Sequence, residues 1–318
     1  MSEKEGKKIE TASVETPEAE PFSHDEARKL LKNARHKAEI PLTVLAVVLT
    51  VGILAFLSYM AVTARGNEEV MEFLTKFTGF EKPIVQFILR AGGDIALAAI
   101  VYLLAMLVQQ NITFLGKVLS NEMRLSDSRF SYLKEYYEDC VKACGMKNVP
   151  ELFIIGTEYK SEVLGVPVRS NNVLAIDKKM ILKAEQTGDW GDVEYILAKR
   201  LAKIHLGYCS LPNQMFTFCI KLIPGLKQLF SRCRTYSIDR VVMALLGREK
   251  AFENVFCECY DVDLYRDLDR KEIIDNKTKS LSRAEEVSKS LENFGSEAPI
   301  APYRLKAMLD TEKDGRLL

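Results

Sequence analysis

Residues 196–208, which read ILAKRLAKIHLGY, carry the strongest structural signal in the chain. Apolar residues return every three or four positions, which predicts a helix with one apolar stripe. The members of this stripe are Val193, Leu197, Leu201, Ile204 and Tyr208. Three cations, Lys199, Arg200 and Lys203, occupy another face of the same helix. On periodicity alone, they form a charged face in contact with solvent.

The overall composition excludes several classes of function. The 318 residues include 44 basic and 44 acidic side chains, so the chain has no net charge and lacks the basic surface of a nucleic-acid binder. It also lacks a GxGxxG motif, a P-loop and a nucleophile elbow, which argues against nucleotide enzymes and serine hydrolases. We therefore expect no nucleic acid among its partners.

A long apolar run near the N-terminus predicts a membrane anchor. The stretch from Pro41 to Val62 (PLTVLAVVLTVGILAFLSYMAV) contains no charged residue. At 1.5 Å per residue it is long enough to cross a hydrocarbon layer of about 30 Å. Its apolar residues fill every helix face, unlike those of a surface helix. We predict a transmembrane helix over residues 41–63.

A second charge-free run, from Ile95 to Gly116, predicts a second transmembrane helix over residues 95–116. Its far end is polar, with Gln109, Gln110, Asn111 and Thr113. Only the part from Ile95 to Val108 is strongly apolar, so an interfacial or core helix remains the alternative.

The two predicted spans fix an expected topology. Residues 28–40 form a basic juxtamembrane segment, which places the N-terminus in the cytoplasm by the positive-inside rule. Two spans return the chain to the same side, so residues 64–94 form an external loop and residues 117–318 form a cytoplasmic domain. Residues 1–27 are polar and predict a disordered tail. The expected location is the cell membrane, with two passes.

The cytoplasmic part predicts an α+β fold that is mainly helical and contains a small sheet. Helical periodicity or strand-like runs bounded by turn residues mark its elements. The predicted helices are Asp127–Cys144, Lys178–Ala184, the helix beginning near Asp192 and Arg234–Gly247, and the predicted strands are Glu151–Gly156 and Asn172–Ile176. The chain closes with a turn that contains proline and with the segment Tyr303–Leu309.

The segment Met215–Phe230 (MFTFCIKLIPGLKQLF) is apolar but contains Lys221 and Lys227 as well as Pro224 and Gly225. It is too short and too charged to cross a bilayer. We interpret it as an amphipathic segment that touches the membrane surface, with packing in the core as a close alternative.

Taken in order, these segments resemble the HtpX-like and CAAX-prenyl-protease-like membrane zinc metallopeptidases, a gluzincin-type family. The likeness covers roughly residues 130–310. Family members carry a helix similar to VLAHELAHIxLGH, matched here by residues 196–208, and a later EYxADR helix, matched by TYSIDR at Thr235–Arg240. The closing APYRLKAML at Ala301–Leu309 is similar to the family's terminal element. The resemblance implies a gluzincin-like metallopeptidase domain behind an N-terminal membrane hairpin.

The chain departs from the family at the catalytic positions. Lys199, Arg200 and Lys203 stand where HExxH supplies two zinc ligands and a general base, and Thr235 stands at the third ligand position. Keeping one lysine neutral at pH 7 costs about 4–5 kcal/mol. One charged ammonium about 5 Å from Zn²⁺ is repelled by about 6–7 kcal/mol at an effective dielectric of about 20. Zinc is expected for the family, but its ligands are absent here.

The substituted positions lead to one preferred hypothesis: a membrane-anchored pseudoprotease with a binding or regulatory role, without cofactor and without hydrolysis. In this hypothesis, Lys199 and Lys203 fill the former metal volume and pair with Asp239 as an ion-pair network. SEVLG at Ser161–Gly165 replaces the family's substrate-edge sequence, so the resemblance does not extend to peptide binding in the family's manner. Expected partners are membrane lipid, other membrane proteins or an active paralogue.

Two alternatives stay open. The first is an active membrane zinc metallopeptidase with a non-standard site built from residues such as His205 or Cys209. The second is an anion-binding module, in which Lys199, Arg200 and Lys203 hold a lipid head group, a phosphate or a carboxylate near the membrane.

Overall fold

The computed structural model describes residues 24–63, 68–79, 81–120, 123–124, 130–156, 163–164, 172–260, 288, 295–309 and 315. Within them the protein is mainly helical with a small sheet, as the sequence predicts. The helices are α1 (His24–Lys32), α2 (Glu39–Thr63), α3 (Glu68–Thr78), α4 (Lys82–Ser120), α5 (Ser131–Ala143), α6 (Lys178–Thr187), α7 (Gly191–His205), α8 (Leu211–Phe216), the 3₁₀ helix η1 (Cys219–Leu222), α9 (Leu226–Leu246), α10 (Arg248–Cys259) and α14 (Ala301–Leu309). The strands are β1 (Met123–Arg124), β2 (Glu151–Ile155), β3 (Val163–Leu164) and β4 (Val173–Asp177).

The described strands form one four-stranded sheet in the order β1-β2-β4-β3. The two central strands are the two that the sequence predicts, and they pair in parallel with Glu151 opposite Val173. The short outer strands pair with them antiparallel. Both central strands are buried on both faces, which is why they read as continuous apolar runs rather than alternating ones.

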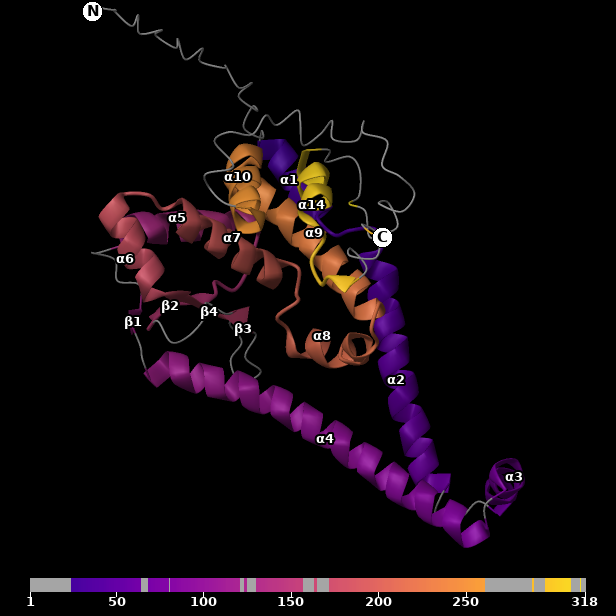
Figure 1. The fold of residues 1–318 in the computed structure, drawn as a ribbon. Coiled ribbons are helices and arrows are strands. Elements are labelled where there is room, and N and C mark those ends of the chain that lie inside the picture. The colour runs from indigo at the N-terminus through magenta and orange to yellow at the C-terminus, as the bar shows by residue number, and fades with distance from the viewer. Residues whose placement is uncertain are drawn as a thin grey trace, which may run out of the picture.

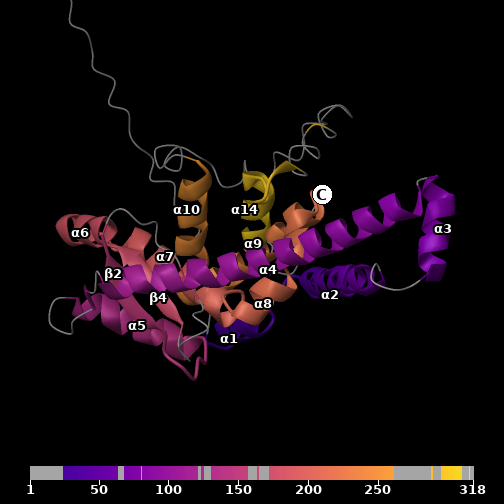
Figure 2. The same ribbon diagram turned by 90° about the horizontal axis from the view of Figure 1, so that it is seen from below.

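The C-terminal end of α4 covers one face of this sheet (Figure 2). Phe114 and Val118 of α4 pack in one cluster with Phe153 and Val173 of the sheet. The predicted second span, residues 95–116, therefore needs correction at its end, because Phe114 belongs to the core of the domain. The polar residues near this end of the apolar run agree with its position beside the domain.

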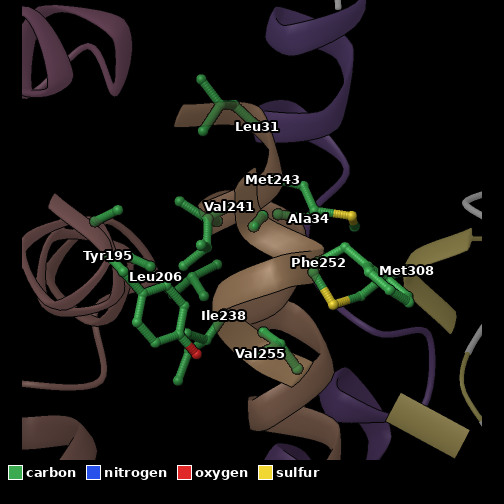
Figure 3. Packing of buried hydrophobic residues seen from close by; sticks show 14 of the residues in the cluster. Leu31, Ala34, Tyr195, Leu206, Ile238, Val241, Met243, Phe252, Val255 and Met308 are labelled. Carbon is green, nitrogen blue, oxygen red and sulfur yellow. The ribbon is translucent and has the colours of Figure 1, made fainter. Parts of the chain in front are cut away.

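Helix α7 packs between two hydrophobic clusters. Leu197 and Leu201 face the cluster formed by α5, α6 and the sheet. Ala198 and Ala202 belong to the cluster formed with α9 and α10. Figure 3 shows Val241 and Phe252 of this cluster. Small alanine side chains let neighbouring helices approach closely, so the LAxxLA pattern suits a helix with packed neighbours on two sides. The predicted single apolar stripe is thus only part of its buried surface.

The N-terminal segment enters the core of the domain before the anchor begins. Helix α1 starts at His24, so the last four residues of the predicted disordered tail, 24–27, are helical; residues 1–23 lie outside the described residues. Acidic residues in its first turn and basic ones in its last favour the helix through its dipole. Leu31 packs against α9, which anchors α1 to the domain.

The predicted basic juxtamembrane segment, residues 28–40, is partly internal. The guanidinium of Arg35 donates to Glu39 at 3.0 Å and to the carbonyl oxygen of Leu206 at 2.7 Å. Glu39 is fully buried and also accepts a hydrogen bond from Ser237 at 2.6 Å. Arg35 therefore forms an ion pair with the buried Glu39 at the start of α2. The positive-inside rule counts basic residues near the membrane and does not reveal this role.

Within the described residues, one helix is long and apolar enough to cross a membrane, and this is α2. Its window Glu39–Phe56 has a mean hydropathy of 2.2 and is only 17% buried, so little protein covers it. In Figure 1, α2 and α4 meet near α3 and diverge toward the domain. The predicted external loop, residues 64–94, contains α3 and the first part of α4, so much of it is helical.

Leu201→Ala should lower the free energy of unfolding by roughly 3 kcal/mol, because truncating a buried leucine leaves a cavity. Leu201 is fully buried in the cluster between α7 and the sheet. Lys183→Ala, which removes an exposed ion pair to Asp192 at 3.2 Å, should change it by less than about 0.5 kcal/mol. Urea unfolding in detergent measures both values. Similar losses in the two variants would contradict the packing of α7 described above.

Candidate functional site

Four helices meet around one buried arginine. Arg304 of α14 donates from Nε to Oδ2 of Asp239 on α9 at 2.6 Å, and from Nη2 to Oδ1 at 2.7 Å. The two side chains are 5% and 3% exposed. This planar, two-point contact is the strongest geometry available to an arginine and a carboxylate.

Glu258 of α10 extends the pair into a network. Its Oε2 accepts hydrogen bonds from Nη1 of Arg304 at 3.0 Å and from the hydroxyl of Tyr195 at 2.6 Å. Its Oε1 contacts the ammonium of Lys199, and that ammonium lies 5.3 Å from the centre of the Tyr195 ring. The charges therefore alternate from Lys199 to Glu258, Arg304 and Asp239, and they balance.

The electrostatics match this arrangement. Burial alone would raise the pKa of Glu258, but the charges of Arg304 and Lys199 outweigh it and lower that pKa to about 2. Burial alone would likewise lower the pKa of Arg304, but the Asp239 carboxylate raises it above its usual value. Burial is also the main cause of the raised pKa of Tyr195. Glu258 and Arg304 are thus ionised at neutral pH, and the hydroxyl of Tyr195 is a neutral donor.

The structure corrects the predicted ion pair. Lys199 and Asp239 belong to one network, but they do not pair with each other: Lys199 contacts Glu258, and Asp239 takes both hydrogen bonds from Arg304. The reason is reach and shape, since the fork of an arginine fits a buried carboxylate better than a lysine does. The side chain of Lys199 is only 25% exposed, so it does not belong to a freely solvated face either.

Thr235 lies on α9, which packs against α7. Its hydroxyl donates to the carbonyl oxygen of Ser231 in its own helix at 3.0 Å. Asp239, one turn after Thr235 on α9, shares the guanidinium of Arg304 with Tyr195 of α7. Arg234, the residue before Thr235, lies over the ring of Tyr208, with its guanidinium carbon 4.4 Å from the ring centre. The segment of α7 that holds the substituted positions therefore runs alongside the segment of α9 that holds Thr235.

Arg200 and Lys203 are half-buried on α7, and both have interaction partners. They lie near the thiol of Cys209, just beyond the helix. Burial raises the pKa of Cys209 to about 11, and the opposing effect of the two positive charges is too weak to offset it. The thiol therefore stays protonated at neutral pH. A protonated thiol is neither a good metal ligand nor a nucleophile, which weighs against Cys209 in a displaced active site.

Two members of the network escaped the sequence analysis. Arg304 stands in the APYRLKAML segment and Glu258 in α10, a helix that the sequence analysis does not predict. The signal in α10 was present: Ala251, Phe252, Val255 and Phe256 recur at helical spacing, and all four are buried. Which acidic residue of α10 contacts the buried Arg304 depends on the angle at which α10 and α14 cross.

The residues present do not fit a zinc ion. Two lysines, an arginine and a threonine stand at the four positions that supply ligands and base in the family that the sequence resembles, and the Lys199 ammonium is engaged by Glu258. In the part of the chain that the structure describes, no three His, Cys, Asp or Glu side chains are grouped so that they could hold a metal ion.

Comparison with protein-family models, with curated proteins and with solved structures finds no match for this chain. The function must therefore be argued from the site itself.

Asp239→Ala should lower the free energy of unfolding by about 3–5 kcal/mol, because it leaves the Arg304 cation buried without its main partner. The double variant Asp239→Leu with Arg304→Met removes both charges, and we expect a much smaller loss. Urea unfolding in detergent compares the three proteins. If the single and double variants lose the same amount, the pair is not the buried contact described here.

Glu258 should make the melting temperature fall as the pH is lowered into the acidic range. Its folded-state pKa of about 2 lies below the ordinary value of 4.5, so its stabilising contribution is present above about pH 4.5 and is lost as the pH falls toward 2. Glu258→Gln should flatten this part of the melting-temperature profile. Glu253→Gln, which alters an exposed glutamate on the same helix, should leave the profile unchanged. Parallel profiles for wild type and Glu258→Gln would refute the prediction.

Proposed function

We propose that the chain is a membrane-anchored pseudoprotease: a metallopeptidase-like scaffold that serves binding or regulation and does not hydrolyse peptides. The observation that carries the proposal is the charge-balanced network of Lys199, Glu258, Arg304 and Asp239. Lys199, which stands at a zinc-ligand position of the HExxH pattern, is built into this network, where it stabilises the fold instead of leaving room for a metal ligand.

Two further observations support the proposal. The helix with the substituted HExxH positions, α7, packs against the helix that carries TYSIDR, α9, as a shared metal site would require. Both helices also contribute to the same network, through Tyr195 and Lys199 on one side and Asp239 on the other. Asp239 and Arg304 lie in two of the segments that carry the resemblance, TYSIDR and APYRLKAML.

The membrane arrangement belongs to the same proposal. We place α2 and α4 across the cell membrane as a two-pass hairpin, with the N-terminus and the domain in the cytoplasm. The apolar, little-covered surface of α2 supports the first pass. The cations near α1 support the orientation, although Arg35 is used inside the protein. Partners expected of such a protein are membrane lipid and other membrane proteins, an active paralogue among them.

A metal-restoration experiment tests the proposal. The full-length wild-type protein, purified in detergent, should contain no stoichiometric zinc by elemental analysis and should not cleave an unfolded protein substrate. The variant Lys199→His, Arg200→Glu, Lys203→His, Thr235→Glu should gain about one zinc per chain, because these side chains supply the ligand set of a gluzincin-type site.

A matched variant with alanine at the same four positions removes the cations without adding ligands and should stay free of zinc. Circular dichroism checks that both variants fold. Stoichiometric zinc with proteolysis in the wild type would overturn the absence of hydrolysis. A folded four-ligand variant that binds no more zinc than the alanine variant would overturn the metallopeptidase scaffold.

A further inference from the structure

The segment Ser210–Leu226 lies directly beside the anchor helix. It contains α8 and η1, and both contact α2 (Figure 1). The hydroxyl of Thr50, in the middle of α2, donates to the carbonyl oxygen of Phe216 at 2.9 Å. Ala46 of α2 packs in one cluster with Ile220 and Phe230. The segment is therefore attached along the first half of α2 rather than at its end.

The position of Thr50 sets the depth of this segment. Between Pro41 and Thr50 the helix rises by about 14 Å, which is close to half of a hydrocarbon layer of about 30 Å. The side chains of Ile40, Val44 and Val48 on this stretch are all more than half exposed. Apolar side chains so exposed on an anchor helix need lipid around them, so Phe216 lies at the level of lipid tails.

The outer surface of the segment suits lipid. Phe216 is 47% exposed and Leu222 is 61% exposed, so the domain covers neither side chain. Lys221 is the one charged residue between Ser210 and Leu226. Its long apolar stem allows the ammonium to reach the head groups while the rest of the segment stays in the hydrocarbon.

Three polar side chains of the segment donate hydrogen bonds to nearby backbone carbonyl oxygens. The hydroxyl of Thr217 donates to the carbonyl oxygen of Asn213 at 2.6 Å, and the amide of Asn213 donates to the carbonyl oxygen of Gly207 at 3.0 Å. The amide of Gln214 donates to the carbonyl oxygen of Cys209 at 3.0 Å. Backbone hydrogen bonds run through α8 and η1 as well. Backbone and side-chain groups satisfied in this way are what a segment needs to enter hydrocarbon without water.

From these observations we infer that Ser210–Leu226 is a re-entrant element, which enters the cytoplasmic leaflet beside α2 and binds lipid acyl chains through Phe216 and Leu222. This inference rests on the proposed anchoring by α2, and it deepens the membrane-surface interpretation by giving the segment a depth and a partner. It also explains why a segment too short to span a bilayer is nevertheless almost free of charge.

Tryptophan quenching by brominated lipids tests the inference in the full-length protein reconstituted in liposomes. Trp190 is the only tryptophan and lies at the start of α7, so it reports on the aqueous domain. In a Trp190→Phe background, Phe216→Trp and Leu222→Trp report on the segment, and Phe56→Trp reports on α2. Lipids brominated along the acyl chains should quench all three introduced tryptophans to a comparable extent, and should leave Trp190 of the wild type unaffected.

The outcomes separate the two proposals. Quenching at position 56 without quenching at positions 216 and 222 would leave the anchor in place and overturn the re-entrant element, and a surface for a second copy or another protein would then explain the exposed residues. No quenching at any of the three positions would overturn the anchor as well. Two reporter positions keep the test valid if one variant fails to fold, which thermal unfolding in detergent reveals.

Discussion

The fold depends on a guanidinium that four helices enclose. A buried arginine is costly unless its donors are satisfied, and here Asp239, Glu258 and Tyr195 satisfy Arg304 from three other helices. Each helix must therefore take its place before the charge is neutralised. A contact of this kind selects one packing of α7, α9, α10 and α14 over others more than it adds to total stability. It fixes the geometry in which the substituted positions stand.

The position of α7 explains why its apolar and its charged residues have different roles. One side of the helix packs on the sheet cluster and another on α9 and α10, so its apolar and alanine positions are constrained by volume. Lys199 lies between these two packed sides of α7 and forms an ion pair with Glu258 of α10. Packing thus fixes the shape of the helix, while its polar positions are free to form ion pairs.

Helix α2 is attached to the domain at two separated points. Glu39 at the first turn of α2 is held by Arg35 and Ser237, and Thr50 farther along holds the carbonyl of Phe216. Two separated attachment points prevent α2 from rotating about a flexible linker. Helix α2 consequently packs as part of the domain along its first half.

The sequence alone determined the element types that local periodicity controls: the long apolar helix α2, the helix α7, which ends at His205 and so does not reach Tyr208, and the two central strands. It also determined that no zinc ligands stand at Lys199, Arg200 and Lys203, because side-chain chemistry does not depend on the fold. The tertiary structure decided which charges meet. Whether Lys199 finds Asp239 or Glu258, and whether Arg304 lies inside or outside, depends on how helices far apart in sequence cross, and no local pattern encodes a crossing angle.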